Sequence, residues 1–158
     1  MYSDNLAREV RDAVAPVLSG MGYALVELAV GRRKGITLVS VVIYRKEGVG
    51  VDDCAAVSEL LLPRLETMEA LPDVSLEVSS PGIERTIRSA EEYAIFQGRG
   101  VRVLVGDQIE WQSGRIDRCE GGTLWLQKGK EHIGFALGDV RKARLDFSVE
   151  VEEDKNAV

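Results

Sequence analysis

The chain has 158 residues, of which 45% are hydrophobic and 29% charged, a composition typical of one ordinary globular domain or two small ones. No apolar run approaches the roughly 20 residues of a membrane span, and the N-terminal residues lack the features of a secretion signal, so a cytoplasmic protein is expected. The net charge of −6 argues against an autonomous nucleic-acid-binding protein, which normally carries a basic excess.

The first elements predicted are a helix and a hairpin. Apolar residues at helical spacing follow a Ser3-Asp4 cap and predict a helix that ends near Gly20. Pro16 should kink or shorten this helix. Apolar and β-branched residues at 23–30 and 36–44 predict two strands that flank a basic loop bounded by glycines.

A second helix opens at Asp52-Asp53, where two carboxylates favour the positive helix N-terminus. Pro63 should limit its length. One side of this helix is expected to be apolar: Cys54, Val57, Leu60, Leu61 and Leu65. A strand at 74–79 completes a small sheet whose one face is covered by the two helices.

The segment 79–82 joins two halves that differ in composition. Pro81 fixes its own φ and pushes Ser80 toward an extended conformation, whereas Gly82 permits backbone angles closed to other residues. This segment is either an ordinary Pro-Gly turn or a hinge at which a binding surface is assembled.

Ser89 to Glu92 matches a capping box, in which the serine caps a backbone N–H and the glutamate reaches back, and a short helix through Phe96 follows. Five short strands separated by glycine-containing turns then indicate a small closed barrel: 101–105, 109–116, 123–126, 133–136 and 141–149. The predicted fold is α+β, with four parts: an N-terminal α/β domain (1–81), a hinge and linking helix (82–98), a barrel (99–150) and an acidic, disordered tail (151–158).

Signs of catalysis are weak. His132 has no nucleophile pattern around it, and the carboxylate pairs Asp52-Asp53 and Glu91-Glu92 lie at predicted helix starts, where capping explains them. The sequence contains no phosphate-binding glycine loop and no HExxH motif, and Cys54 and Cys119 are too far apart to suggest a metal pair or a disulfide. No catalytic residue, metal or cofactor is therefore predicted.

Cations give a stronger signal for binding. Arg32, Arg33 and Lys34 lie at a hairpin tip, where phosphate contacts are commonly made, although a solvated turn also explains them. Other cations bracket the short helix behind the hinge or mark the last strand: Arg85, Arg88, Arg99, Arg102, Arg141, Lys142 and Arg144. Neighbouring residues of a strand point to opposite faces, so the last three cannot form one continuous patch by themselves. Trp111 and Trp125 fit the barrel core or rim better than base stacking.

The charge is unevenly distributed. Residues 1–80 contain 8 Lys and Arg against 12 Asp and Glu, residues 81–149 contain 11 against 10, and residues 150–158 contain 1 against 4. Any RNA contact should therefore be local, and a basic protein partner fits the balance better than free nucleic acid. A monomer is expected, because no heptad pattern indicates a partner chain.

Three motifs resemble the ribosome maturation factor family RimP, over nearly the full length of the chain. Residues 51–58 (VDDCAAVS) are similar to the family's "DDC..vS" helix start, residues 76–85 (LEVSSPGIER) to its hinge, and residues 141–145 (RKARL) to its final strand. The hinge motif is the specific one. Thr86 departs from the family pattern, which has proline at this position.

The resemblance implies an N-terminal α/β domain and a C-terminal Sm-like small β-barrel. It also implies a non-enzymatic assembly factor that binds the immature small (30S) ribosomal subunit, assists ribosomal RNA folding, and associates with the basic small-subunit protein beside the decoding centre. The alternative is a general RNA-binding module acting through its barrel.

The hinge and the basic clusters are predicted to form the binding surface: Arg32, Arg33, Lys34, Ser80, Pro81, Gly82, Glu84, Arg85, Arg88, Lys142 and Arg144. Arg85 has two interpretations. It contacts the subunit, or it is structural and pairs with a carboxylate such as Glu84 or Glu77.

Overall fold

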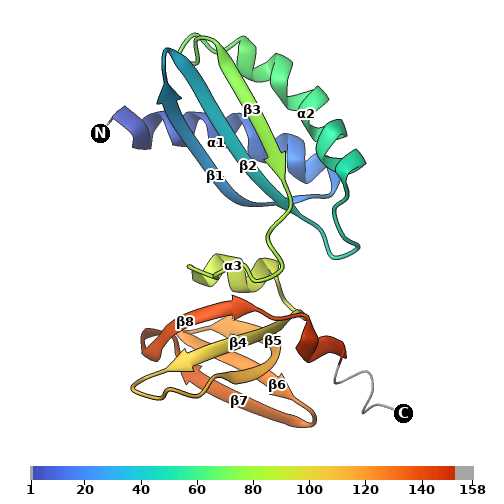
Figure 1. Cartoon of the computed structure of the whole chain (residues 1–158), viewed down its shortest axis with the longest axis vertical. Coiled ribbons are helices and arrows are strands. Elements are labelled where there is room, and N and C mark those ends of the chain that lie inside the picture. Colours follow the sequence, from blue (N-terminus) through green and yellow to red (C-terminus); the bar gives the residue numbers. More distant parts are fainter. Residues whose placement is uncertain (1, 152–158) are drawn as a thin grey trace. The chain divides into compact units, whose positions relative to one another are not determined.

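The computed structural model describes residues 2–151, which divide into two compact units, one up to Pro81 and one from Gly82 (Figure 1). The first unit contains α1 (Tyr2–Met21), β1 (Ala24–Arg33), β2 (Ile36–Tyr44), α2 (Val51–Glu66) and β3 (Val74–Ser79). The second contains α3 (Ala90–Ile95), β4 (Gly100–Val105), β5 (Gln112–Glu120), β6 (Thr123–Lys128), β7 (Glu131–Ala136), η1 (Leu137–Asp139) and β8 (Val140–Leu145). The predicted acidic tail lies outside the described residues, apart from Val151. None of the described helices has the length and apolar character needed to cross a membrane.

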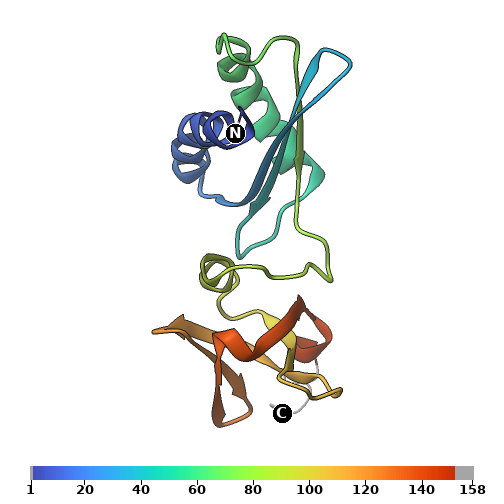
Figure 2. The ribbon, with the colours of Figure 1, turned by 90° about the vertical axis from the view of Figure 1, so that its left-hand side faces the viewer.

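The first unit is a three-stranded sheet in the order β1-β2-β3, with β1 antiparallel and β3 parallel to β2. Figure 2 shows α1 and α2 on the same side of this sheet, as the sequence predicted. Buried residues alternate along β2: Thr37, Val39, Val41 and Ile43. They share a core with buried residues of the two helices: Val10, Val14 and Leu18, and Val57, Leu61 and Leu65. Each such apolar side chain contributes about 1.5–3 kcal/mol relative to an exposed one.

Neither helix-internal proline ends its helix, and α1 reaches Met21, close to the predicted end near Gly20. Pro16 lies within the 20-residue α1, and Pro63 lies within α2, which continues to Glu66. A proline inside a helix costs about 3 kcal/mol. The fully buried neighbours Val14 and Leu18 and Leu61 and Leu65 offset that cost, because ending either helix early would expose them.

Three further local predictions for the first unit were wrong. Since α1 begins at Tyr2, Ser3 and Asp4 lie inside its first turn and are not its cap. Leu60 is 46% exposed, so it lies outside the apolar stripe of α2. The hairpin loop contains two residues only, Lys34 and Gly35, with φ values of 52° and 82°. Positive φ at both positions is typical of a type I′ turn, which matches the twist of the strands and leaves Arg32 and Arg33 inside β1.

The second unit is a five-stranded antiparallel sheet in the order β7-β6-β5-β4-β8. Strands β7 and β8 are its two ends, and no pairing joins them within residues 2–151, so the closed barrel is not confirmed. Buried residues from its strands and from the segments around α3 form its core: Ile87, Tyr93, Phe96, Val101, Val103, Ile116, Leu124, Leu126, Ala143, Leu145 and Val149.

The chain after β8 differs from the sequence-based prediction. The last strand ends at Leu145 rather than at Val149, and a helical turn follows at 148–151. The Asp146 carboxylate accepts a hydrogen bond from Ser148 N at 3.1 Å and so caps this turn. Glu150 is also ordered, because its Oε2 accepts a hydrogen bond from Gly100 N at 2.9 Å. Strand β5, in turn, begins at Gln112 rather than at Ile109.

Candidate nucleic-acid interface

Glu92 organises the chain that follows the hinge. The predicted Ser89 cap is confirmed, since Ser89 Oγ accepts a hydrogen bond from Glu92 N at 3.3 Å. The Glu92 carboxylate, however, reaches past the cap residue: its Oε2 accepts from Arg88 N at 2.7 Å, and its Oε1 accepts from the Arg85 guanidinium, with Nε at 2.8 Å. Glu92 is 5% exposed, so this carboxylate is a buried anchor rather than a surface cap.

Arg85 is structural in this arrangement. Its side chain is 13% exposed and pairs with Glu92, a carboxylate that the structural interpretation of the sequence did not name. Its carbonyl oxygen accepts a hydrogen bond from Leu145 N at 2.9 Å, which ties the residue to β8. Both the backbone and the side chain of Arg85 therefore fix the start of the second unit.

Gly82 makes no use of a glycine's backbone freedom. Its φ is not positive, and no atom lies within 4 Å of the position that a Cβ atom would take. Its carbonyl accepts a hydrogen bond from Arg85 N at 3.0 Å, which closes a turn. Ser80 and Pro81 end the first unit, and Gly82 begins the second.

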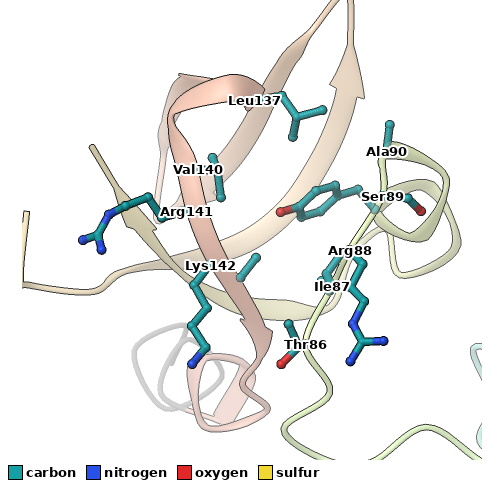
Figure 3. A pocket seen from close by; sticks show the side chains of 11 residues that line it. Thr86, Ile87, Arg88, Ser89, Ala90, Leu137, Val140, Arg141 and Lys142 are labelled. Carbon is teal, nitrogen blue, oxygen red and sulfur yellow. The ribbon is translucent and has the colours of Figure 1, made fainter. Parts of the chain in front are cut away.

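Strand pairing collects cations on one face of the second unit. Arg102 of β4 is paired directly with Arg144 of β8, and Arg144 is paired in turn with Thr86. Directly paired residues project to the same face of a sheet, as do residues two apart on a strand, such as Lys142 and Arg144. Figure 3 shows Lys142, Thr86 and Arg88 projecting in the same direction. We call Arg88, Arg102, Lys142 and Arg144 the basic row.

The cations of β8 were expected to lie on opposite faces, and Arg141 does lie apart from Lys142. Its guanidinium donates to the carbonyl oxygens of Gly106 and Gln108 in the loop after β4. The basic row is continuous because its other members come from neighbouring segments rather than from β8 alone.

Two arginines of the basic row are poorly neutralised. Like charges directly opposite each other on a sheet destabilise it, and Arg102 and Arg144 form such a pair. The Nε atom of each is buried and has no hydrogen-bond acceptor within residues 2–151. The Arg102 guanidinium lies 3.8 Å from the carboxylate of Glu84, which is 66% exposed. A bound anion can replace so weak a counter-ion at the Arg102 guanidinium, since this side chain is 30% exposed.

Tryptophan rings lie beside two of the second unit's arginines. The Arg102 guanidinium lies 5.1 Å from the centre of the Trp111 ring, and Arg118 lies 5.1 Å from that of Trp125. Such contacts hold a cation in place while leaving its other donors available. Both tryptophans are half-buried, which suits the rim of the sheet.

A hollow of about 320 Å³ lies between the segment 86–93 and the segment 137–143 (Figure 3). Apolar side chains form much of its wall: Ile87, Ala90, Leu137, Val140 and Ala143. Two polar residues, Thr86 and Ser89, also line it. Arg88 and Lys142 of the basic row are among its lining residues, so a hollow with a mixed polar and apolar wall adjoins a cationic face. Burial raises the pKa of Tyr93, another lining residue, to about 12, so its phenol is neutral.

The predicted cations of the first unit form a separate group. Arg32, Arg33 and Lys34 are all exposed at the β1–β2 turn. Arg32 Nη2 lies 3.5 Å from the carbonyl oxygen of Ala70. These residues and the basic row therefore belong to different units.

Asp53 joins three segments of the first unit at the start of α2. Its Oδ1 accepts hydrogen bonds from the Tyr23 hydroxyl at 2.5 Å and from Arg45 Nη2 at 2.9 Å, and its Oδ2 accepts from Gly50 N at 2.7 Å. The Tyr23 hydroxyl and the Gly50 amide lower the pKa of this carboxyl. Capping, as predicted, therefore accounts for Asp53.

The described residues include no group of three or more His, Cys, Asp and Glu side chains that could hold a metal ion. His132 is half-exposed, with its Nδ1 3.4 Å from Asp117 Oδ2. Cys54 and Cys119 are free and half-buried, and burial raises the pKa of both thiols. Neither thiol therefore has the lowered pKa of an activated nucleophile.

Comparison with known proteins agrees with the motifs. Residues 13–84 match the family described as the RimP N-terminal domain. A protein of Borrelia hermsii (strain HS1 / DAH), "Ribosome maturation factor RimP", is 28% identical over 137 residues, which cover 87% of this chain and 94% of that protein. Over most of its length the chain is therefore similar to the RimP family. Two residues of its family-like motifs, Asp53 and Arg85, form carboxylate–arginine pairs inside the two units, so these motifs have a structural basis here.

Sequence reasoning named Arg102 only as one of the cations around the short helix, and it did not predict the role of Glu92 beyond the capping box. The capping-box pattern identifies Glu92 but not its pairing with Arg85. Arg102 joins the basic row only through the pairing of β4 with β8, two strands far apart in the sequence. In a strand, residues two apart share a face, so Arg102 lies on the same face as Leu104, and Lys142 on the same face as Arg144. This two-residue period is the signal that could have placed Arg102 in the basic row.

Proposed function

We propose that this protein is a non-enzymatic maturation factor that binds the immature small (30S) ribosomal subunit. The observation that carries the proposal is the basic row, a set of cations with an under-neutralised arginine pair at its centre, on a protein whose net charge is −6. The name of the Borrelia relative, a ribosome maturation factor, supports the same function.

The basic row is the proposed contact with ribosomal RNA. Guanidinium groups bind phosphate oxygens through two parallel hydrogen bonds, and the partly exposed Arg102 side chain has the distant, exposed carboxylate of Glu84 as its counter-ion. Arg32, Arg33 and Lys34 at the β1–β2 turn are a second proposed RNA contact. Glu84, Arg85 and the hinge residues Ser80, Pro81 and Gly82 are assigned to positioning, since Arg85 is committed to Glu92.

A basic ribosomal protein is the second proposed partner. The first 80 residues have an excess of carboxylates, 12 against 8 cations, which attracts a basic protein and repels RNA phosphates. This division favours a composite ribonucleoprotein site, such as that of the basic small-subunit protein beside the decoding centre, over naked RNA. We place the interaction in the cytoplasm and expect the protein to act as a monomer.

The proposed mechanism is a shift of populations. A factor that binds a correctly arranged subunit better than a misfolded one favours the correct arrangement by the ratio of the two affinities. No bond is made or broken, which suits the structural roles of Asp53 and Glu92.

We also assign the second unit to an Sm-like architecture, in which the last strand pairs with the first.

Co-sedimentation with immature and mature small subunits at two salt concentrations tests this function. We expect the immature particle to bind more tightly, and the double variant Arg88→Ala/Lys142→Ala to bind it more weakly. The slope of log affinity against log salt should fall by about 1 for each phosphate that the variant no longer neutralises. The matched control is Lys128→Ala/Lys130→Ala at the β6–β7 turn, which removes the same charge outside the basic row.

The alternative, a general RNA-binding module, makes a different prediction in the same experiment. Such a module should bind naked ribosomal RNA as well as it binds the immature particle, with a steep loss of affinity in salt. No preference of the protein for either particle over free RNA contradicts the maturation function.

A further inference from the structure

We infer that the hollow beside the basic row receives the base of a single unstacked RNA nucleotide, whose phosphate binds the cations at its mouth. This inference rests on the proposed function and specifies one contact within it. It starts from the juxtaposition of a hollow that has apolar and polar lining residues with Arg88 and Lys142, all within the second unit (Figure 3).

The size and the wall of the hollow suit a nucleobase. Its volume of about 320 Å³ lies at the small end of the range for ligand sites, roughly 300–1,000 Å³. Ile87, Val140 and Ala143 provide apolar contact for the flat faces of a heterocycle, and the neutral Tyr93 phenol adds no charge. RNA is commonly recognised through unstacked bases that enter such apolar sites.

Polar residues can contact the edge of a base as well, since Thr86 and Ser89 are among the lining residues. The Ser89 hydroxyl itself is directed toward α3, where its Oγ accepts a hydrogen bond from Glu92 N. The Thr86 hydroxyl projects toward the side of the hollow on which Lys142 and Arg88 lie (Figure 3). These groups are fixed by the helix cap and by the pairing of Thr86 with Arg144, so little entropy is lost on binding.

The cations at the mouth select an anionic ligand. A basic ribosomal protein would be repelled by Arg88 and Lys142, whereas the phosphate of a nucleotide is attracted. The remainder of the basic row, Arg102 and Arg144, continues on the same face and can hold neighbouring phosphates of the strand. The hollow and the row together therefore favour RNA over protein as the occupant.

The experiment compares nucleoside 5′-monophosphates with ribose 5-phosphate, which lacks the base, by amide chemical-shift titration of the full chain. We expect at least one of AMP, GMP, CMP and UMP to bind about tenfold more tightly than ribose 5-phosphate, with shifts at Thr86, Ser89 and Ala90. Lys142→Ala should weaken both kinds of ligand. An acidic peptide should bind no better than ribose 5-phosphate.

Ala90→Phe, which fills the hollow from an exposed position, should abolish the advantage of the nucleotide. Ala94→Phe, also exposed on α3 but not part of the wall, is the matched control and should retain it. Equal binding of nucleotide and ribose 5-phosphate to the unmodified chain overturns the inference, as does tighter binding of the acidic peptide. Either result leaves the subunit-binding test of the basic row unaffected, so the two proposals fail separately.

Discussion

Each unit contains a helix whose start is held by a carboxylate that accepts a backbone hydrogen bond and binds an arginine. The two helices depend on this carboxylate to different degrees. Asp53 is the third residue of α2 and Glu92 the third residue of α3. Each accepts a hydrogen bond from a backbone N–H just before its helix and binds an arginine from the preceding segment, Arg45 or Arg85. The side chain of Asp53 is 23% exposed and that of Glu92 is 7% exposed.

The surroundings of the two carboxylates explain the difference. Helix α2 has 16 residues and buries Val57, Leu61 and Leu65 against the sheet, so apolar packing holds it whatever its cap does. Helix α3 has six residues, too few to be stable alone. Its position depends on Glu92, which also fixes Arg85 and the backbone of Arg88 beside β8. The hinge motif therefore stabilises the second unit from within.

The largest effect is expected for Glu92→Ala. Removing this carboxylate leaves the Arg85 guanidinium buried without its carboxylate partner, which typically costs about 3–5 kcal/mol. Urea unfolding followed by tryptophan fluorescence measures the loss, because Trp111 and Trp125, the only two tryptophans of the chain, both lie in the second unit.

Glu91→Ala is the matched control for Glu92, because Glu91 is the exposed neighbour on the same helix turn. It should change the free energy of unfolding by less than about 0.5 kcal/mol. If Glu91→Ala and Glu92→Ala destabilise the second unit equally, the carboxylate network is not what fixes α3.

The second-largest effect is expected for Gly100→Ala at the start of β4. A Cβ atom at Gly100 would overlap the carbonyl oxygen of Asp146 and lie 2.9 Å from Val149 Cβ. The helical turn after β8 must then move, which should cost about 1–3 kcal/mol by the usual penalty of overpacking. Tryptophan fluorescence in urea again reports it. Unchanged stability would mean that this turn is only loosely attached to the sheet.

A smaller, pH-dependent effect is expected for Asp53→Asn in the first unit. The pKa of Asp53 is lowered in the folded state, chiefly by the Tyr23 hydroxyl, so its ionised form stabilises the fold. That contribution is fully present above the ordinary aspartate pKa of about 4 and is lost as the pH falls through the lower folded value. The stability difference between the unmodified chain and the variant should therefore shrink on acidification.

Urea unfolding followed by far-UV circular dichroism at a series of pH values measures this difference, because the two long helices, α1 and α2, lie in the first unit. Asp52→Asn is the control, since Asp52 is exposed and next to Asp53. Its stability should follow that of the unmodified chain at every pH. A constant gap between Asp53→Asn and the unmodified chain would show that ionisation of Asp53 contributes nothing.

Local sequence patterns predicted much of the first unit, and long-range pairing limited the rest. The strand 74–79 matches β3 because an apolar, β-branched run carries its own signal. Pro16 does not shorten α1 as expected. Local helix propensity does not include the packing of Val14 and Leu18 in a shared core, which holds the helix together around the proline. The basic row was not predicted as a unit, because Arg102 and Arg144 become neighbours only through the pairing of β4 with β8. The binding roles of the predicted residues stay predictions. The burial of Arg85 shows where this side chain lies, and it does not test whether the residue contacts a partner.

The smallest effect is expected for Gly82→Ala, in the motif that marks the family most specifically. Gly82 has an ordinary φ and open space around it, so the added methyl group meets no atom within 4 Å. The free energy of unfolding should change by less than about 0.5 kcal/mol in either unit, measured by fluorescence and circular dichroism together. Gly100→Ala is the counterpart that should destabilise. If Gly82→Ala nevertheless weakens binding to the immature subunit while stability is unchanged, the glycine is needed by a partner that approaches the backbone closely, and the hinge is a contact as well as a structural joint.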